Sequence, residues 1–395
     1  MRSLLAIRAA RPFLALALVL VLGTIVGLVV LRPDGSSPAR DSLPGDLRTR
    51  EAEVTTLAAI ACRVPNQRDC RLVRIRLLDG PEQGRVASFR TGETRADPDL
   101  SIGDRLRVVR NPPPPPGTPP EARGDAYSFA DLDRRSPMLW LTIAFAAIVV
   151  VFGRVRGALS LVGLAASLVV VGAFIVPAIL DGRPPLAVAV VGSLAVMLLT
   201  IALAHGLGLK SLAAILGTAA SLALTVTLAV IFTNLTEITG LSSEEAVLLQ
   251  VGQSDLSLEG LVLAGMVIGA LGVLDDVTVS QASAVMALRR ANPAQCFGEL
   301  YRGALTVGRD HVAATVNTLV LAYVGTSLPI LLIFSVGETP FADAVSKEAV
   351  AEQIVAALVG SIGLISAVPI TTALAALLAA RLPPDQIDVE PVHAH

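Results

Sequence analysis

Two adjacent aspartates, Asp275 and Asp276, lie inside a long apolar run, and no other feature constrains the fold of this chain more. The run covers residues 258–290 and reads LEGLVLAGMVIGALGVLDDVTVSQASAVMALRR. It is long enough to cross a bilayer as a helix. A carboxylate at bilayer depth is costly, so it usually lies inside a helix bundle or beside a water-filled path. The run therefore predicts a membrane protein with a buried acidic site.

One face of this predicted helix combines glycines, an acid and hydroxyls. At about 100° per residue, its members fall within roughly 80° of arc; they are Gly265, Gly269, Gly272, Asp276, Ser280 and Ser283. Glycines allow a second helix to approach closely. We therefore expect this face to pack against another helix and to enclose Asp276. Asp275 lies to the side of the stripe, so the two carboxylates need not share one environment.

The composition fits a chain that lies mostly in lipid. It is 53% hydrophobic and 16% charged, whereas soluble domains carry about 25% charged residues. A net charge of −2 argues against a nucleic-acid partner. The histidines and cysteines are too scattered to predict a metal site, and the sequence predicts no cofactor.

The chain divides into five predicted parts. They are a cytoplasmic start with a membrane anchor (1–31), an extracytoplasmic β-rich domain (32–111), a proline-rich linker (112–136), a transmembrane helical bundle (137–381) and a cytoplasmic tail (382–395). The uncharged run Pro12 to Leu31 could be a cleaved signal peptide or an uncleaved anchor. It exceeds the roughly 7–15 residues of a signal h-region, which favours the anchor.

The β-rich domain contains short strand-like pieces separated by turn residues. Val73, Ile75 and Leu77 share one face at a period of two. We expect a small, OB-like barrel or sandwich that acts as a spacer or as a docking domain. Cys62 and Cys70 bracket a short loop, and outside the membrane such a pair can form a disulfide. Two reduced thiols are the alternative.

About eight spans follow from the apolar runs. They are expected near 12–31, 137–152, 158–180, 186–204, 211–232, 258–290, 311–334 and 350–380. Most basic residues of the bundle then lie on one side, which is the cytoplasmic side by the positive-inside rule. Both termini are predicted there, in a bacterial cytoplasmic membrane. The acidic 233–257 loop, with a short amphipathic helix at 241–251, lies outside.

The seventh span carries a second polar face. His311, Thr315, Thr318, Ala322 and Gly325 recur at the helical period, and Asn317 adds an amide. We expect this face to contact the Asp276 face, while Arg309 and Asp310 form an interfacial motif that caps the helix start. Small residues and hydroxyls also serve as plain helix packing, and that alternative stays open for the hydroxyls.

Two stretches, GALGVLDDVTVSQASAV and GRDHVAATVNTLVLAYVGTSLPILL, resemble the two signature segments of the YibE/F-like family of bacterial multi-span membrane proteins. The corresponding positions here are Gly269, Gly272, Asp276 and Ser280, then Gly308, Arg309, Asp310, Asn317, Thr318, Tyr323 and Gly325. The resemblance implies the same plan of anchor, extracytoplasmic β-rich domain and bundle. It implies no particular activity. The acid pair is also similar to that of proton-driven RND exporters, a likeness of one helix that supports a mechanism by analogy only.

The sequence is compatible with two functions. The first is a transporter, or a transport component, that couples proton or cation movement to a relay; the candidate residues are Asp276, Asp275, Ser280, Asn317, Thr318 and His311. The second is an assembly or scaffold factor that docks a partner through the extracytoplasmic domain. An intramembrane enzyme ranks last, because no second mid-span acid faces the pair. The lipid bilayer is the predicted partner, with a homo-oligomer as an open option.

Overall fold

The computed structural model describes residues 10–35, 49–62, 70–92, 97–112, 114–115, 117, 124–252 and 256–381. The chain forms two compact units, one comprising residues 43–148 and the other comprising residues 1–42 with 149–395. The predicted cytoplasmic tail, the first nine residues and most of the proline-rich stretch lie outside the described residues.

The smaller unit is a five-stranded antiparallel sheet with strand order β3-β2-β1-β4-β5. Its strands are β1 (Arg50–Ala59), β2 (Arg71–Leu77), β3 (Val86–Thr91), β4 (Arg105–Arg110) and β5 (Tyr127–Leu132). Val73, Ile75 and Leu77 are all buried in its core, so the predicted inward face of β2 is confirmed. The opposite residues of β2, Arg74 and Arg76, are exposed, as a strand with one buried face requires.

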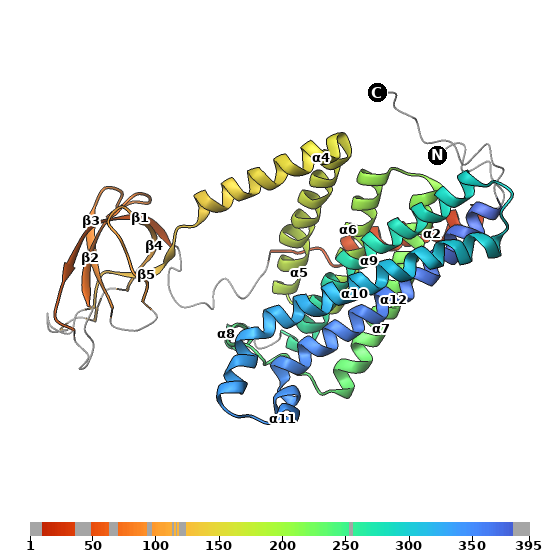
Figure 1. Cartoon of the computed structure of the whole chain (residues 1–395). Helices are drawn as coiled ribbons and strands as arrows, with labels where there is room; N and C mark the ends of the chain where they lie inside the picture. The colour runs from red at the N-terminus through yellow and green to blue at the C-terminus, as the bar shows by residue number, and fades with distance from the viewer. Residues whose placement is uncertain are drawn as a thin grey trace. The chain divides into compact units, whose positions relative to one another are not determined.

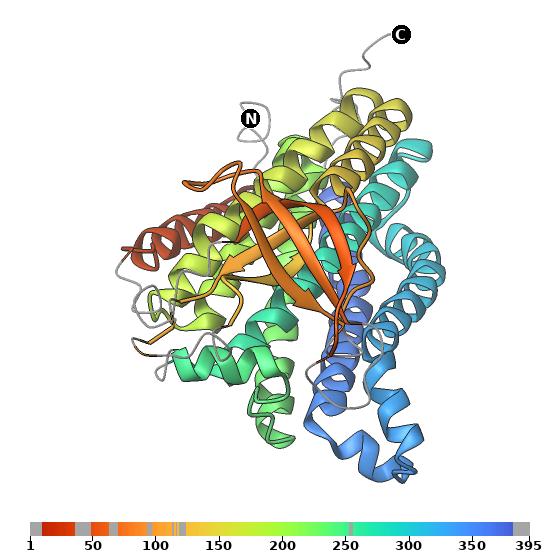
Figure 2. The same cartoon turned by 90° about the vertical axis from the view of Figure 1, so that its left-hand side faces the viewer.

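The sheet is curled (Figure 2). Side-chain contacts join its two edge strands, β3 and β5. The rings of Phe89 on β3 and Phe129 on β5 lie with their centroids 6.4 Å apart. The backbone amide of Arg90 donates to the Asp125 carboxylate at 3.0 Å. Tyr127 Oη donates to Glu82 Oε2 at 2.7 Å, which ties β5 to the turn between β2 and β3. These contacts bring together strands that are farthest apart in the ladder order.

The boundary between this domain and the predicted linker needs a correction. β5 falls inside the stretch assigned to the linker, yet it pairs with β4 over most of its length. Charged residues and prolines surround this short strand, so its alternation of Tyr127 and Phe129 is easy to overlook. The β-rich unit therefore extends through Leu132.

A disulfide joins Cys62 to Cys70, with their Cα atoms 5.3 Å apart, and Cys296 is free and exposed. The bridge closes the connection between β1 and β2. It joins the two cysteines that the sequence predicts as a pair. A closed loop this short should stabilise the domain by about 2–3 kcal/mol, chiefly by restricting the unfolded chain.

The larger unit is built from helices (Figure 1). They are α2 (Arg11–Val30), α4 (Arg135–Val170, whose first residues belong to the smaller unit), the π-helical turn η3 (Val171–Ile175), α5 (Val176–Leu180), α6 (Pro185–His205), α7 (Leu209–Leu235), α8 (Glu244–Gly252), α9 (Leu258–Ala291), α10 (Phe297–Val336), α11 (Phe341–Ser346) and α12 (Glu348–Ala380). Ser243 Oγ accepts the backbone amide of Ala246 and so caps α8, the predicted short helix before the sixth span.

Within the described residues, seven helical segments are long and apolar enough to cross a membrane. One of them, Arg135–Leu180, has 46 residues, about twice what a single crossing needs. Arg154 interrupts it with φ 49° and ψ −131°, a left-handed backbone that no helix interior adopts. Gly157 lies against the backbone carbonyl of Val149 with no room for a Cβ, so the chain turns back on itself here. The predicted second and third spans are the two arms of this one broken segment.

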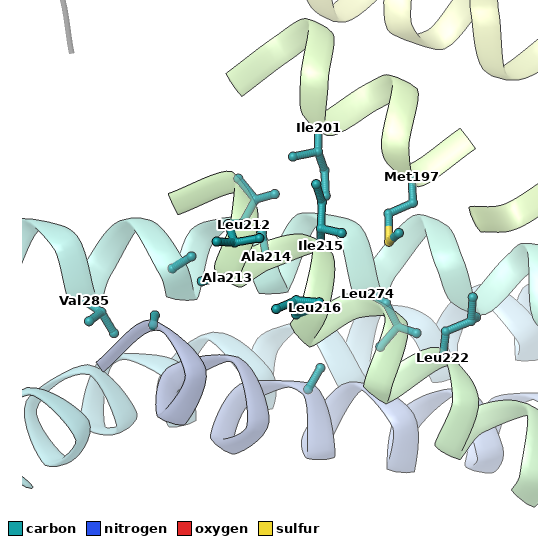
Figure 3. Packing of buried hydrophobic residues seen from close by; sticks show 14 of the residues in the cluster. Met197, Ile201, Leu212, Ala213, Ala214, Ile215, Leu216, Leu222, Leu274 and Val285 are labelled. Atoms are coloured by element: carbon teal, nitrogen blue, oxygen red, sulfur yellow. The ribbon is translucent and has the colours of Figure 1, made fainter. Parts of the chain in front are cut away.

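The centre of the bundle is formed by α7, α9 and α12, with α6 and α10 packed around them. Figure 3 shows apolar side chains of α6, including Met197 and Ile201, pointing toward α7 and α9. Leu274 of α9 and Leu222 of α7 are almost completely buried in this cluster. α9 therefore packs against the bundle through its apolar face, which lies opposite the glycine stripe.

The tightest helix crossings use glycines that the stripe does not include. Gly217 of α7 lies against Thr371 of α12, and Gly363 of α12 lies against Thr225 of α7. Around Gly265, Gly272 and Gly325 nothing lies within 4 Å of a Cβ position, and Gly269 has only the Tyr323 hydroxyl at 3.4 Å. The prediction that these glycines pack helices together is therefore wrong for Gly265, Gly272 and Gly325, whereas Gly269 contacts α10 through Tyr323. Leucine, valine and alanine on the other side of α9 bury more apolar surface, and that side decides which way the helix faces.

Candidate functional site

Asp275 is the more buried of the two adjacent carboxylates. It lies near the midpoint of α9 and is half-buried against α6. Its Oδ2 accepts a hydrogen bond from Thr200 Oγ1 at 2.9 Å. Its Oδ1 is shielded from solvent and has no hydrogen-bond partner among the described residues. A buried carboxylate oxygen without a donor is costly, and such groups often mark functional positions.

The Thr200 hydroxyl has a choice of acceptors. Besides Asp275 Oδ2, its oxygen lies 3.0 Å from the carbonyl of Val196 and 3.1 Å from that of Met197. A hydroxyl carries one proton and two lone pairs, so it can donate to the ionised carboxylate or turn to a carbonyl and accept from the protonated one. Both protonation states of Asp275 can therefore be hydrogen-bonded to the same partner.

A pair of buried threonines continues from this carboxylate into the bundle. Thr278 Oγ1 donates to the backbone carbonyl of Asp275 at 3.1 Å, and it lies 2.6 Å from Thr218 Oγ1 of α7. Thr218 and Thr278 are both completely buried. The hydroxyls thus join α6, α7 and α9 around Asp275.

Gln281 is a buried polar residue that is not among the predicted site residues. Its amide donates to the carbonyl of Ala304 on α10 at 3.1 Å and to Thr372 Oγ1 on α12 at 3.3 Å. Gly308 of α10 lies directly against it. Gln281 follows Thr278 by three positions, so the two share a helix face. That second polar face, opposite the stripe, is the signal that could have found both residues.

Asp276 has a different environment from the one predicted. It is exposed on α9, as are Gly265, Gly269, Gly272 and Ser280. The prediction that Asp276 is buried against the seventh span is therefore wrong. The physical reason is the same apolar face of α9, because turning that face to the core turns the stripe outward.

The predicted partners on the seventh span also face outward. His311, Asn317, Thr318 and Gly325 are exposed on α10, and the Thr318 hydroxyl bonds the carbonyl of Ala314 in its own helix. The Thr315 hydroxyl likewise bonds the carbonyl of His311. These two hydroxyls therefore bond within their own helix, as in the alternative of plain helix packing.

Arg309 and Asp310 do not cap a helix start. They lie inside α10, which begins twelve residues earlier at Phe297. The cap is Cys296, whose backbone amide donates to Glu299 Oε2 at 2.9 Å. Both charged side chains are exposed. The helix begins early because Leu300 and Ala304, which precede the motif on the same helix, bury apolar surface against the bundle.

A cavity of about 290 Å³ lies at the far end of the stripe from Asp276. Its lining includes Gly265 of α9, Tyr323 of α10, Glu352 of α12 and Ser242 of the loop before α8. Ser242 Oγ donates to Glu352 Oε2 at 2.6 Å. Gly265 precedes Asp276 by three helical turns, about 16 Å along the axis. The described residues contain no group of three or more His, Cys, Asp or Glu side chains that could hold a metal ion.

A comparison with protein families decides the identity of this bundle. Residues 141–381, more than half of the chain, match the model of the YibE/F-like protein family. The chain belongs to the YibE/F-like family. The matched residues include Asp275, Asp276, Gln281 and the whole of α10, while the β-rich unit precedes them. No curated protein and no solved structure matches the chain.

Proposed function

We propose that this YibE/F-like protein is a transporter, or the membrane component of one, that couples the movement of a proton or small cation to Asp275. Asp276 is its accessible neighbour on the same helix. In this proposal the protein moves an ion and catalyses no covalent reaction. The setting is a bacterial cytoplasmic membrane, with an OB-like β-rich domain outside it.

The observation that carries the proposal is the contact between Asp275 and Thr200. A relay residue has to be stable in both protonation states, and the competing acceptors of the Thr200 hydroxyl provide for both. The second carboxylate oxygen, Oδ1, keeps a free lone pair for an incoming proton or cation. A purely structural aspartate would normally have both oxygens satisfied.

In this proposal the neighbouring carboxylate, Asp276, gives the ion access to Asp275. Asp276 is exposed next to the half-buried Asp275. In this proposal Asp276 faces a water-filled path at bilayer depth, through which an ion reaches the pair. The glycine stripe leaves an open strip of α9 between Asp276 and the cavity beside Glu352. Polar positions inside membrane helices usually line such paths.

One observation favours the alternative of an assembly or scaffold factor. Glycines and a carboxylate that face outward from a bundle offer a surface for a partner's membrane helix. Under that alternative Asp276 matters for assembly, and Asp275 can be neutralised without consequence. The two aspartates therefore discriminate between the two functions.

Reconstitution in liposomes with an enclosed pH-sensitive dye tests the proposal. An imposed ion gradient should produce proton flux in the wild type. Asp275→Asn should abolish it, because the side chain keeps its size but cannot exchange a proton. Thr200→Val should reduce it about tenfold, on the scale of one lost hydrogen bond to a charged group.

Asp343→Asn is the matched control, since Asp343 is an exposed carboxylate on the short helix α11. It should leave flux unchanged. Wild-type flux in a folded Asp275→Asn protein would exclude the relay. Loss of partner capture in Asp276→Asn, with normal Asp275→Asn behaviour, would support the scaffold instead.

A further inference from the structure

A second cavity, separate from the aspartate site, lies between α2 and the start of α7. It has a volume of about 580 Å³, within the about 300–1,000 Å³ of typical ligand sites. Its walls are almost entirely apolar, with Leu14, Leu18 and Val21 on α2 and Leu212 and Ile215 on α7. Neighbouring side chains of α2, such as Val19, are exposed, so the groove opens on the lipid-facing side of the anchor.

One end of this groove is polar. It is formed by the N-terminus of α7, where the N-cap residue Gly208 has no side chain to satisfy the first amides. Unsatisfied amides and the helix dipole make such an end favourable for an anion. Arg11, in the first turn of α2, lines the same end and forms no ion pair with any described residue.

A buried hydroxyl also lines this end. Ser211, three residues after the N-cap, is 2% exposed. Its Oγ has no hydrogen-bond partner among the described residues. A buried hydroxyl without a partner costs free energy unless a ligand supplies one. The apolar walls, the uncapped amides, Arg11 and Ser211 therefore converge on one ligand chemistry, an apolar chain that ends in an anionic oxygen group.

We propose that this groove binds an anionic phospholipid, with one acyl chain along α2 and α7 and the headgroup phosphate at Arg11, Ser211 and the start of α7. Bilayer lipid is the source, because the groove opens where lipid surrounds the bundle. The bound lipid fills the gap between the anchor helix and the core and fastens α2 to α7. The site is independent of the ion relay.

Native mass spectrometry of the full-length protein tests this site. The protein is purified in detergent and supplied with phosphatidylglycerol or phosphatidylcholine of the same chain length. The wild type should retain phosphatidylglycerol preferentially. Arg11→Gln should weaken that retention about fivefold, on the scale of one basic residue near a phosphate. Ser211→Ala should weaken it less.

Groove-filling variants test the acyl chain. Leu14→Trp and Ile215→Trp each place a large ring in the groove, from opposite walls, and both should abolish retention. Val19→Trp is the matched control, because Val19 is 65% exposed on the same helix and does not line the groove. It should bind phosphatidylglycerol like the wild type.

Two results would overturn the proposal. Equal retention of phosphatidylglycerol in the wild type, Arg11→Gln and both groove-filling variants would mean that only annular lipid is present. Both lipids carry a phosphate and only phosphatidylglycerol has a net negative charge, so equal retention of both lipids by the wild type would show that the groove does not select an anionic phospholipid. Circular dichroism of each variant shows whether it is folded, and the conservative Arg11→Gln and Ser211→Ala changes keep the test open if a tryptophan variant is not.

Discussion

At the scale of single residues, two neighbours in the sequence have opposite environments. Asp275 is half-buried beside Thr200, while Asp276 is exposed. Adjacent positions on a helix point about 100° apart, so a boundary between core and surface can pass between them. The helical period predicts that the two carboxylates can differ, but the one predicted to be buried, Asp276, is the exposed one. The glycines and serines of the α9 stripe predict a face that contacts another helix, whereas in the structure most of that face is exposed.

Glycine substitutions provide a direct test of which helix faces are packed. Gly217→Ala places a Cβ against Thr371, and overpacking of this kind costs about 1–3 kcal/mol. Gly272→Ala meets nothing within 4 Å, so it should be neutral or stabilising by up to about 1 kcal/mol through helix propensity. Thermal unfolding of the two variants in detergent measures both changes. If Gly272→Ala lowered the stability more than Gly217→Ala, the glycine stripe of α9 would be a packed face.

The acidic region was predictable from the sequence, whereas its surroundings were not. An aspartate pair in an apolar span is unusual and can be recognised from the sequence of that span alone. Thr200 and Thr218 lie beside α9 because α6 and α7 pack against it. Gln281 of α9 gains its hydrogen-bond partners from α10 and α12. A helical wheel describes one helix at a time and cannot choose which face of α9 those helices cover. That choice depends on the summed burial of many leucine, valine and alanine side chains.

At the scale of elements, one strand could be predicted from its own sequence and another could not. The inward face of β2 follows from its alternation alone. β5 was missed because it is short and gains its place from pairing with β4 and from side-chain contacts to β3. Long helices were found with nearly correct bounds, except that α10 begins at Phe297. Its first turns are too polar to read as a span, although Leu300 and Ala304 bury them against the bundle.

The closure of the curled sheet should depend on pH through Tyr127 and Glu82. The hydrogen bond from Tyr127, with help from Arg110 and Arg85, lowers the pKa of Glu82 below its ordinary 4.5. Burial, followed by the hydrogen bond to Glu82, raises the pKa of Tyr127 above its ordinary 10.0. A lowered acid pKa stabilises the fold above pH 4.5 and loses that effect as pH falls through the folded value. A raised pKa stabilises it below pH 10.0 and loses the effect as pH rises through the folded value.

Tyr127→Phe should therefore weaken the domain between these limits and matter less beyond them. Proteinase K cleavage within residues 49–132 of the full-length protein, mapped by mass spectrometry, reports the open population. The ratio of variant to wild-type cleavage rates should be greatest near neutral pH and should approach one at both extremes. A ratio that does not change with pH would show that the pair does not close the sheet. Ser128→Ala, which changes an exposed side chain of the same strand, is the control.

At the scale of the whole molecule, one contact bears on the number of crossings. The backbone amides of Asp34 and Gly35, just after α2, donate to the Asp181 carboxylate at 2.8 and 2.9 Å. The chain is therefore on the same side of the bundle after α2 and after α5. Between those points it must cross the membrane an even number of times. We expect the broken segment Arg135–Leu180 to supply two crossings, with its turn at Arg154 on the opposite side.

We accordingly expect eight crossings, with both termini on the side of Arg154 and the loop at 206–208. Single cysteines in a Cys62→Ser, Cys70→Ser, Cys296→Ser background test this in intact cells with a membrane-impermeant maleimide. Gly35→Cys, Arg183→Cys and Glu338→Cys should be labelled from outside, and Arg156→Cys and Gly206→Cys only after the cells are opened. Labelling of Arg156→Cys in intact cells would mean that the broken segment never crosses. Opposite results for Gly35→Cys and Arg183→Cys would mean an odd number of crossings, which would separate the two loops that the Asp181 hydrogen bonds join.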